Sequence, residues 1–346
     1  MKILQVIDQL GLGGAERVCV NMANLLYRYG FDVKLVVFDK SGPLFDLIDE
    51  GVEVVILGRK KHKFRAYKTL IKEVKEADVV HIHMRQNYKY VKKTLLAYRV
   101  KKKLILHDHF GKIAINKRIP TFYRTWYRPD FYIGCSQLLY DWATNIVGLD
   151  PQTVFLVNNF VLQYPPKTKN TRSKKDLVMV GNLKPVKNHF FAVEIAKELN
   201  MNLTVYCGPS DSSYFKDLKK KIDNIGMSDH VDFIHGKTNV QEELHQYKYA
   251  LLTSTSEGDP LVLIEFLSQG IPFLSYNVGE SVKIIRQYLP HSVQDTFDKK
   301  EWLANFEKLK DTTQEEVLHV FDKHYASKQF LDRYIDIYEK FMQTTA

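Results

Sequence analysis

The sequence has few cysteines, and it lacks a long apolar run and a recognisable leader. Cys19, Cys135 and Cys207 are odd in number, far apart and flanked by apolar residues, which suits reduced, buried thiols rather than a disulfide framework or a zinc site. No apolar run approaches the roughly 20 residues that span a bilayer. The opening MKILQVID alternates like a strand and does not resemble a signal peptide. We therefore expect a soluble, cytoplasmic protein.

The chain has no excess of negative charge, and all of its excess positive charge lies in the first half. Residues 1–163 contain 26 Lys and Arg against 15 Asp and Glu, whereas residues 164–346 contain 24 against 25. Lys and Arg are interleaved with apolar residues in three segments, 59–68, 88–103 and 117–128. Each segment taken alone is most simply a solvated face of the protein. Taken together, however, the basic segments would be attracted to an anionic membrane surface, which contributes roughly 1 kcal/mol per Lys or Arg close to it.

An anionic membrane surface is therefore a candidate partner, which would place the protein peripherally on the inner face of the cytoplasmic membrane. Nucleic acid is the competing explanation of the same charge. No zinc-finger, homeodomain or RRM-type signature accompanies the charge, so we expect no nucleic acid partner.

A chain of 346 residues is long enough for two α/β domains, and its pattern fits them. Short apolar runs rich in β-branched residues alternate with longer helical patterns, which is typical of βαβ units and parallel sheets. We expect two Rossmann-like domains, with strands near 2–7, 32–38, 53–57, 78–83, 103–107, 131–135 and 153–157 in the first, and near 176–181, 202–207, 231–235, 249–253 and 272–276 in the second. The clearest helices are expected at 15–29, 137–147, 188–199, 213–225, 239–246 and 260–269.

Residues 160–175, with two prolines, several lysines and no periodicity, read as an interdomain linker. We accordingly expect a first domain at 1–163 and a second at 164–325. The tail from 299 onward looks helical, and its last amphipathic stretch, at 326–346, is expected to pack back on the first domain.

Two glutamates stand out in the segment that follows the strand near 249–253. Pro260 is well placed as a first helical residue and Gly270 as the residue just past the helix end, so Glu257 lies in a loop and Glu265 in the second turn. The run LVLIEFL is apolar on all sides, which predicts a buried helix in which the Glu265 carboxylate needs a polar partner. Ligands of open α/β sheets bind at such strand ends, where helix N-termini favour phosphates. Alternatively, Glu257 is an exposed turn residue and Glu265 a salt-bridged residue of the core.

The segment SEGDPLVLIEFLSQGIPFLS resembles the signature of the retaining glycosyltransferases of family 4, which have the GT-B fold: two Rossmann-like domains facing each other across a cleft. The family pattern is Glu, seven residues, Glu, then a small residue, Gly and Pro, matched here by Glu257, Glu265, Ser268, Gly270 and Pro272. The resemblance implies that Glu257 contacts hydroxyls of the donor sugar and Glu265 the ribose of the nucleotide. It implies further contacts from the backbone of Asp259, Pro260 and Leu261. Asp259 departs from the glycine or aromatic residue that is common at its position.

The segment VMVGNLKPVKNHFFAVEIAKEL resembles the part of the family in which an arginine and a lysine bind the diphosphate. Lys187 matches the lysine. Asn182 stands at the arginine position, a departure for which Lys184 lies near enough in sequence to substitute. An ordinary solvated residue at a helix start is the alternative for Lys187.

Gly11, Gly13 and Gly14 lie between the first strand and first helix, where glycine lets backbone N–H groups approach a ligand closely. Glu16 stands where a dinucleotide fingerprint needs a third glycine, so an NAD site is not expected. The resemblance implies that Gly13 and Gly14 contact donor or acceptor.

Histidines end two of the expected strands, in VVHIH and LILHDH. The resemblance favours His107 beside the reacting sugar, with His109 as its rival, and His83 is an acceptor-side candidate. A His-x-His pair can also begin a metal site, but no third ligand with suitable spacing is evident along the chain.

The implied chemistry is transfer of a hexose from a nucleoside diphosphate sugar, UDP-sugar being favoured, to a glycan or lipid-linked acceptor in surface-polysaccharide synthesis. His107, Glu257 and Lys187 are the catalytic candidates. No Asp-x-Asp motif is present, so metal-independent catalysis without a cofactor is expected. Two alternatives remain open: a nucleotide-sugar epimerase that uses no NAD, and a catalytically weak donor-binding subunit that partners a transferase.

Overall fold

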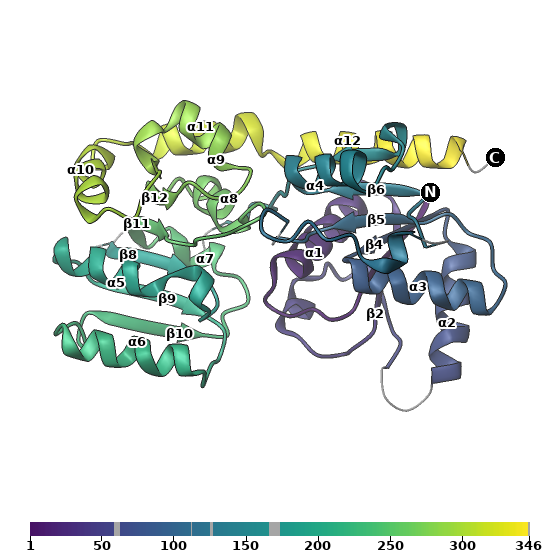
Figure 1. Cartoon of the computed structure of the whole chain (residues 1–346), viewed down its shortest axis with the longest axis horizontal. Coiled ribbons are helices and arrows are strands. Elements are labelled where there is room, and N and C mark those ends of the chain that lie inside the picture. Colours follow the sequence, from purple (N-terminus) through teal and green to yellow (C-terminus); the bar gives the residue numbers. More distant parts are fainter. Residues whose placement is uncertain (59–62, 112, 125–126, 166–173, 345–346) are drawn as a thin grey trace. The chain divides into compact units, whose positions relative to one another are not determined.

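A computed structural model describes the chain except residues 59–62, 112, 125–126, 166–173 and 345–346. The chain divides into two compact units: unit 1 comprises Met1–Phe160 and Ser327–Ala346, and unit 2 comprises Val161–Ala326 (Figure 1). Half of the expected linker, residues 166–173, lies outside the described residues. Of its first residues, Phe160 and Val161 are fully buried, and the Gln163 amide donates to the Ser268 carbonyl in unit 2.

Unit 1 is built on a seven-stranded sheet with the order β3-β2-β1-β4-β5-β6-β7. Every pair of neighbouring strands is parallel, as expected for a Rossmann-like unit. The strands are β1 (Lys2–Ile7), β2 (Asp32–Val37), β3 (Glu53–Ile56), β4 (Val79–His83), β5 (Ile105–Asp108), β6 (Phe131–Gly134) and β7 (Val154–Leu156).

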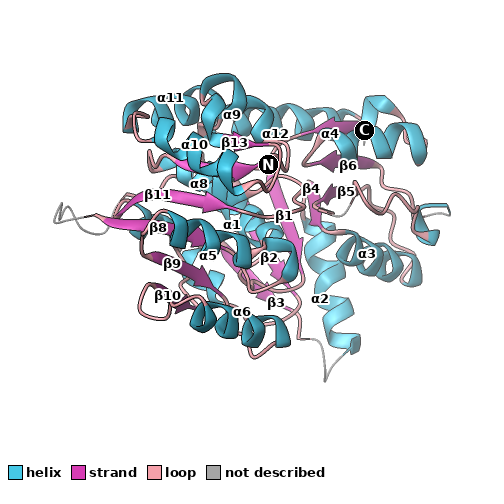
Figure 2. Ribbon diagram, turned by 60° about the vertical axis from the view of Figure 1, so that its left-hand side comes forward, coloured by secondary structure: helices cyan, strands magenta, loops and turns pink. Residues whose placement is uncertain are grey.

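Helices cover both faces of this sheet (Figure 2). Side chains alternate along a strand, so Leu4, Val80 and Leu106 share one face, where they form a core with helices α2, α3 and α4. Helices α1 and α12 pack against the other face and against each other. The bounds are α1 (Gly14–Arg28), α2 (Lys63–Glu76), α3 (Arg85–Ala97), α4 (Gln137–Asp141) and α12 (Ser327–Gln343).

Unit 2 contains a six-stranded parallel sheet with the order β10-β9-β8-β11-β12-β13. Its helices α5, α6 and α10 pack on one core, which includes Trp302 and Phe306, and α11 packs against α8. The strands are β8 (Lys175–Val180), β9 (Leu203–Cys207), β10 (Val231–His235), β11 (Tyr247–Leu252), β12 (Phe273–Tyr276) and β13 (Val293–Gln294). The helices are α5 (His189–Glu198), α6 (Ser213–Asn224), α7 (Gln241–Leu244), α8 (Leu261–Ser268), α9 (Val282–Tyr288), α10 (Lys299–Leu309) and α11 (Gln314–His324).

The expected strands agree with the structure to within about two residues, and β13 was not predicted because two residues leave no pattern. The helix expected at 137–147 changes at Trp142 into a π-helical turn, Trp142–Ile146. Short 3₁₀ turns occupy Pro43–Leu47, Thr121–Arg124, Pro151–Thr153, Pro185–Lys187 and Pro290–Ser292. The three cysteines are buried and free, as predicted. Among the described residues, no helix combines the length and the apolar character needed to cross a membrane.

Candidate functional site

The loop between β11 and α8 carries the acidic pair of unit 2. Pro260 has extended backbone angles and is the N-cap of α8, which begins at Leu261, so it stands one residue earlier than predicted. Within the described residues the cap makes no side-chain hydrogen bond, and the Leu263 N–H donates to the Pro260 carbonyl at 3.1 Å, so the N–H groups of Leu261 and Val262 are those that a ligand at the helix start would meet.

Helix α8 is buried because its residues are apolar on every side. Its residues from Val262 to Ser268 are all buried, and Glu265 is 9% exposed. Gly270 ends the helix with φ +64°, and a Cβ there would lie 2.5 Å from the Gln314 side chain of α11. Only glycine combines this backbone with such close packing, so α8 is fixed at both ends, and with it the Glu265 carboxylate.

Backbone carbonyls bind the strand end of β11 to the turn that carries Lys187. The Thr253 hydroxyl donates to the Lys187 carbonyl at 2.9 Å, and the Thr255 N–H donates to the Val186 carbonyl at 2.8 Å. Lys187 Nζ then forms an ion pair with Glu257. The structure thus brings together two residues, 70 positions apart in sequence, that the sequence predicted to share a site.

This ion pair is only partly covered, because the Lys187 side chain is 22% exposed and the Glu257 side chain 17%. An incoming anion can reach the ammonium group, and an incoming hydroxyl can reach the carboxylate. A bound phosphate would replace one negative partner of Lys187 by another, so the charge would stay compensated.

Asp259 is buried and holds the loop in place. Its carboxylate accepts hydrogen bonds from the N–H and the hydroxyl of Ser281, which precedes α9. Gly279, at φ +87°, lies so close that a Cβ would approach the Pro260 ring at 2.3 Å. Ser281 could not be predicted from the sequence, because its role depends on a contact between two loops.

Asn182 and Lys184 lie in the loop after β8. The Asn182 side-chain oxygen accepts the Gly208 N–H at 3.2 Å, which fixes the loop after β9, and Lys184 is exposed. Behind them His189 is buried, with Nε2 3.3 Å from the Gly181 carbonyl oxygen. Burial lowers the pKa of His189 to about 4. Sequence analysis missed this imidazole, whose burial is not visible in the pattern.

Four histidines gather on one face of the unit 1 sheet. His81 and His83 are two residues apart on β4, and His83 lies opposite His107 on β5. Both strands point these side chains to the face covered by α12, away from the core that contains Val80, Ile82 and Leu106. The ring centroids of His83 and His107 are 5.2 Å apart, and those of His107 and His109 are 4.1 Å apart.

Hydrogen bonds connect part of this cluster to its surroundings. His83 Nε2 lies 2.8 Å from Gln5 Oε1, and His83 Nδ1 lies 3.1 Å from His109 Nε2. His81 Nδ1 lies 2.9 Å from the Tyr338 hydroxyl of α12. Burial is the main cause that lowers the pKa of His81 and of His109 to about 3, and it takes the pKa values of His83 and His107 well below their usual range. All four rings are therefore neutral near pH 7.

The pair formed by His81 and His83 on β4 has a third histidine, His107, beside it. One ring nitrogen each from His81, His83 and His107 lies within 4.8 Å of the others. The pair considered in the sequence was His107 and His109, whereas pairing of β4 with β5 places His107 beside His81 and His83. Asp108 points to the opposite face, where Arg85 binds it at 2.6 Å.

Exposure separates the two rival histidines. His107 is fully buried, and neither of its ring nitrogens has a hydrogen-bond partner. His109 stands past the end of β5 and is half-buried. Gly13 and Gly14, in the same unit, form the start of α1, where Gly13 is the N-cap without a side-chain acceptor and Gly14 is exposed.

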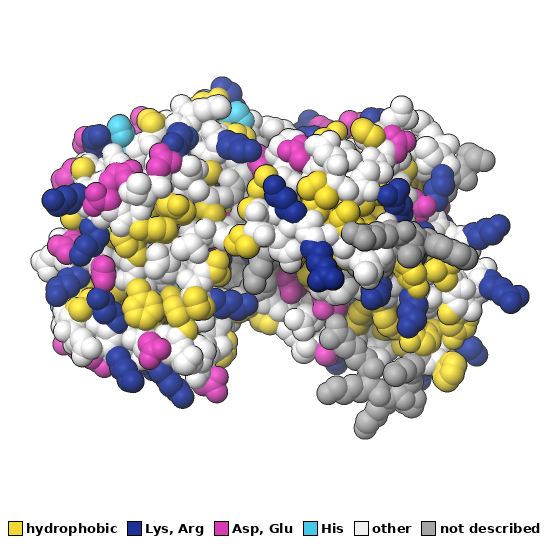
Figure 3. Space-filling model, in the orientation of Figure 1, with side chains coloured by type: hydrophobic (Ala, Val, Ile, Leu, Met, Phe, Trp, Pro, Cys, Tyr) yellow, Lys and Arg dark blue, Asp and Glu magenta, His cyan; other side chains and the backbone are white. Residues whose placement is uncertain are grey.

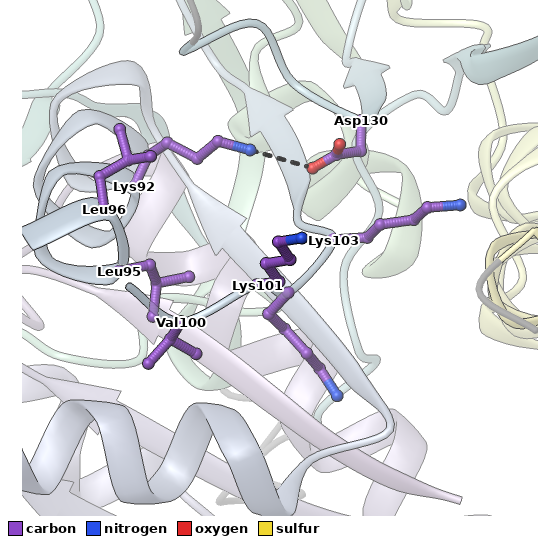
Figure 4. Close-up of a pocket in the computed structure, with 8 residues that line it drawn as sticks. Lys92, Leu95, Leu96, Val100, Lys101, Lys103 and Asp130 are labelled. Atoms are coloured by element: carbon purple, nitrogen blue, oxygen red, sulfur yellow. Dashed lines mark hydrogen bonds and ion pairs between the residues drawn. The ribbon is translucent and has the colours of Figure 1, made fainter. Parts of the chain in front are cut away.

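A lysine-rich pocket of about 470 Å³ lies at the opposite edge of the unit 1 sheet, where β5 and β6 begin (Figure 4). Lys92 pairs with Asp130 at 3.3 Å, and the Lys102 ammonium donates to the Ala77 carbonyl. Figure 3 shows Lys and Arg side chains spread over the visible face with apolar side chains between them. Parts of the basic segments 59–68 and 117–128, residues 59–62 and 125–126, lie outside the described residues.

Two family models match this chain. Residues 12–161 match the family described as Glycosyltransferase Family 4, and residues 163–323 match Glycosyl transferases group 1. A Haemophilus influenzae protein named as an uncharacterized glycosyltransferase is 26% identical over 287 residues, which cover 78% of this chain and 79% of that protein. An Escherichia coli UDP-Gal:alpha-D-GlcNAc-diphosphoundecaprenol alpha-1,3-galactosyltransferase is 23% identical over 78% of this chain and 77% of its own length.

The fold is similar to that of solved structures. The crystal structure of Anabaena Alr3699/HepE in complex with UDP-glucose has a TM-score of 0.79 with this chain, at 15% identity, and covers 99% of this chain and 100% of its own.

Proposed function

Because the chain belongs to the family 4 type glycosyltransferases of GT-B fold, we propose that it transfers a sugar from a nucleoside diphosphate sugar to an acceptor hydroxyl with retention of configuration. The observation that carries the proposal is the juxtaposition of Lys187 and Glu257 in front of α8, whose buried Glu265 lies in the second turn of the helix. In such a transfer the bond between the anomeric carbon and the diphosphate oxygen breaks. A bond to the acceptor oxygen forms, and the acceptor proton leaves.

The donor roles follow the positions of the charges. Lys187 and the free N–H groups at the start of α8 stabilise the negative charge that develops on the leaving diphosphate. Glu257 accepts hydrogen bonds from sugar hydroxyls and Glu265 from the ribose. UDP is favoured as the nucleotide, in line with the UDP-glucose complex of the Anabaena protein and the UDP-Gal named for the Escherichia coli relative.

The backbone of Asp259, Pro260 and Leu261 lines the sugar end of this site. Because the Asp259 carboxylate is bound by Ser281, it acts by shaping the loop, and it is a determinant of which sugar is accepted. Lys184 supplies a second positive charge near the diphosphate in place of the arginine that Asn182 replaces.

Unit 1 carries the acceptor roles. The Escherichia coli relative is named for transfer to a diphosphoundecaprenol-linked glycan, which supports a lipid-linked acceptor. The excess of Lys and Arg in residues 1–163 fits an anionic lipid surface and a phosphate-bearing acceptor. We place His109, which is half-buried, nearer the reacting groups than the fully buried His107. Gly13 and Gly14 offer backbone N–H groups to the same ligands.

We propose that transfer needs no metal ion at the diphosphate, because Lys187, Lys184 and the α8 N-terminus supply the positive charge there. A chelator added during turnover should leave the initial rate unchanged. A rate that falls with chelator and recovers with Mg²⁺ or Mn²⁺ would refute this part of the proposal.

The decisive experiment incubates the protein with a panel of UDP- and GDP-sugars, with and without undecaprenyl-diphosphate-linked glycan. Transfer requires both release of nucleoside diphosphate and glycosylated lipid, only when acceptor is present. Acceptor-independent release with epimerised sugar would indicate the NAD-independent epimerase. Donor binding without any release would indicate the donor-binding subunit.

A further inference from the structure

We propose that His81, His83 and His107 form a transition-metal site inside unit 1, of the kind that zinc occupies. The three imidazoles lie on one face of adjacent strands, are fully buried, and place one ring nitrogen each within 4.8 Å of the others. No step of the proposed transfer uses this trio.

The strongest support is the unsatisfied hydrogen-bonding capacity of these rings. Among the residues that the structure describes, both ring nitrogens of His107 and Nε2 of His81 are buried and have no hydrogen-bond partner. An unpaired buried polar group costs about 1–3 kcal/mol, so three such atoms in one place need an explanation. A metal ion accepts lone pairs from several imidazoles at once, and it would satisfy Nε2 of His81 and one nitrogen of His107.

The surrounding groups also suit a metal site. Ligating histidines usually donate their second N–H to a carbonyl or carboxylate, which fixes the tautomer. Gln5 Oε1 lies 2.8 Å from His83 Nε2, and the Tyr338 hydroxyl lies 2.9 Å from His81 Nδ1. These contacts leave Nε2 of His81 for a metal ion, whereas Nδ1 of His83 would exchange its contact with His109 Nε2 for the metal.

The chemistry of the ligand set limits the choice of metal. Neutral imidazole suits Zn²⁺, Co²⁺, Ni²⁺ and Cu²⁺, whereas Mg²⁺ and Ca²⁺ prefer oxygen ligands. Zinc–nitrogen bonds of about 2.0–2.1 Å place two ligand nitrogens of a tetrahedral site roughly 3.3 Å apart. The rings would therefore move together by about an ångström, which small side-chain rotations allow.

The ligands of this centre belong to β4 and β5 of unit 1, and they share no residue with Lys187 and Glu257 of unit 2. Helix α12 covers the cluster through Tyr334 and Tyr338. We expect the ion to enter during folding, and its binding energy to stabilise the folded chain.

The test uses the full chain without a polyhistidine tag, unfolded with a chelator and refolded with or without Co²⁺. We expect one Co²⁺ per chain, with the intense visible bands of a low-coordinate site, displaced by Zn²⁺. His107→Asn and His81→Asn should abolish the bands, and His291→Asn, which alters an exposed histidine, should retain them. Wild-type protein that binds no Co²⁺, or bands that persist in His107→Asn, would overturn the proposal.

A second variant keeps the test decisive if the ligand variants fail to refold. Gln5→Met retains all three imidazoles and removes the carbonyl that faces His83. It should weaken Co²⁺ binding about 10- to 100-fold. Unchanged affinity in Gln5→Met would contradict the proposed orientation of His83 and therefore the site.

Discussion

Both units place polar side chains at the carboxyl edge of their sheets, but these side chains differ in charge and in burial. In unit 2 the side chains are charged, paired and partly open to solvent, as Lys187 and Glu257 show. In unit 1 they are neutral imidazoles, and three of the four are fully buried. Both arrangements follow parallel strands, at whose carboxyl ends ligands of this architecture bind.

The difference teaches how each unit can contribute to catalysis. A charge is costly to bury without a partner, and unit 2, which we propose binds the diphosphate, keeps these charges near the surface in a compensating pair. An imidazole can lose its proton instead and enter the interior. We therefore expect the charged groups of unit 2 to contribute more to catalysis than the neutral imidazoles of unit 1.

The largest expected effect is that of Lys187→Ala. Removing a positive charge from the leaving diphosphate should lower kcat/KM for transfer by about 10²–10³-fold, the usual range for loss of one stabilising group. Steady-state release of nucleoside diphosphate in the presence of acceptor measures it. Lys248→Ala is the matched control, because Lys248 also pairs with a carboxylate, Asp176, but at the surface. Equal losses in the two variants would remove Lys187 from the site.

Glu265→Gln should raise KM for the donor by about 10- to 100-fold and change kcat little. The amide keeps the shape of the side chain in the packed helix α8 but weakens the hydrogen bond to the ribose, a contact present before and during the reaction. Initial rates over a range of donor concentrations separate the two constants. A fall in kcat at unchanged KM would assign Glu265 to the reacting centre instead.

Much of this donor site could be predicted from sequence, because its residues lie in two continuous segments with strong local signals. Glu257, Glu265 and Gly270 are ordered along one loop and one helix, and Lys187 lies two residues before helix α5. What could not be predicted depends on contacts across the fold. Ser281 reaches Asp259 from another loop, and His107 joins His81 only because β5 pairs with β4. Burial of His107 is equally invisible along the chain.

Unit 2 also buries an imidazole, and pH can show that burial has the same consequence there. The folded-state pKa of His189 is about 4, below the unfolded value of about 6.5, so the unfolded chain binds more protons between these values. Stability is therefore fully present above pH 6.5 and falls as pH drops toward 4. Between pH 7 and pH 5 the contribution of His189 falls by about 2 kcal/mol.

His189→Gln isolates this contribution, because other buried histidines affect wild type and variant alike. Urea unfolding at pH 7 and pH 5 should show a drop in the free energy of unfolding that is about 2 kcal/mol smaller in the variant. An identical drop in both proteins would mean that His189 is protonated as easily in the folded chain as in the unfolded one.

His109→Asn tests whether unit 1 contributes less to the chemistry. A neutral, half-buried imidazole can orient a hydroxyl but cannot compensate the diphosphate charge, so we expect kcat to fall about tenfold. His319→Asn, at an exposed histidine of unit 2, is the control. A loss as large as that of Lys187→Ala would break the division between the units.

The smallest effect concerns the packing that fixes α8. Gly270 and Gly226 both have positive φ, at +64° and +73°, but a Cβ would lie 2.5 Å from Gln314 at Gly270 and would meet nothing within 4 Å at Gly226. Alanine at either site should therefore lower the free energy of unfolding by about 1 kcal/mol, because its backbone is strained at positive φ. Gly270→Ala should lower it by about 1 kcal/mol more, because the new Cβ displaces side chains of α11. Urea unfolding of the two variants measures the difference. Since α8 carries Glu265, Gly270→Ala should also raise the KM for the donor, whereas Gly226→Ala should not. Equal stabilities and equal KM values in the two variants would show that α11 does not hold α8 in place.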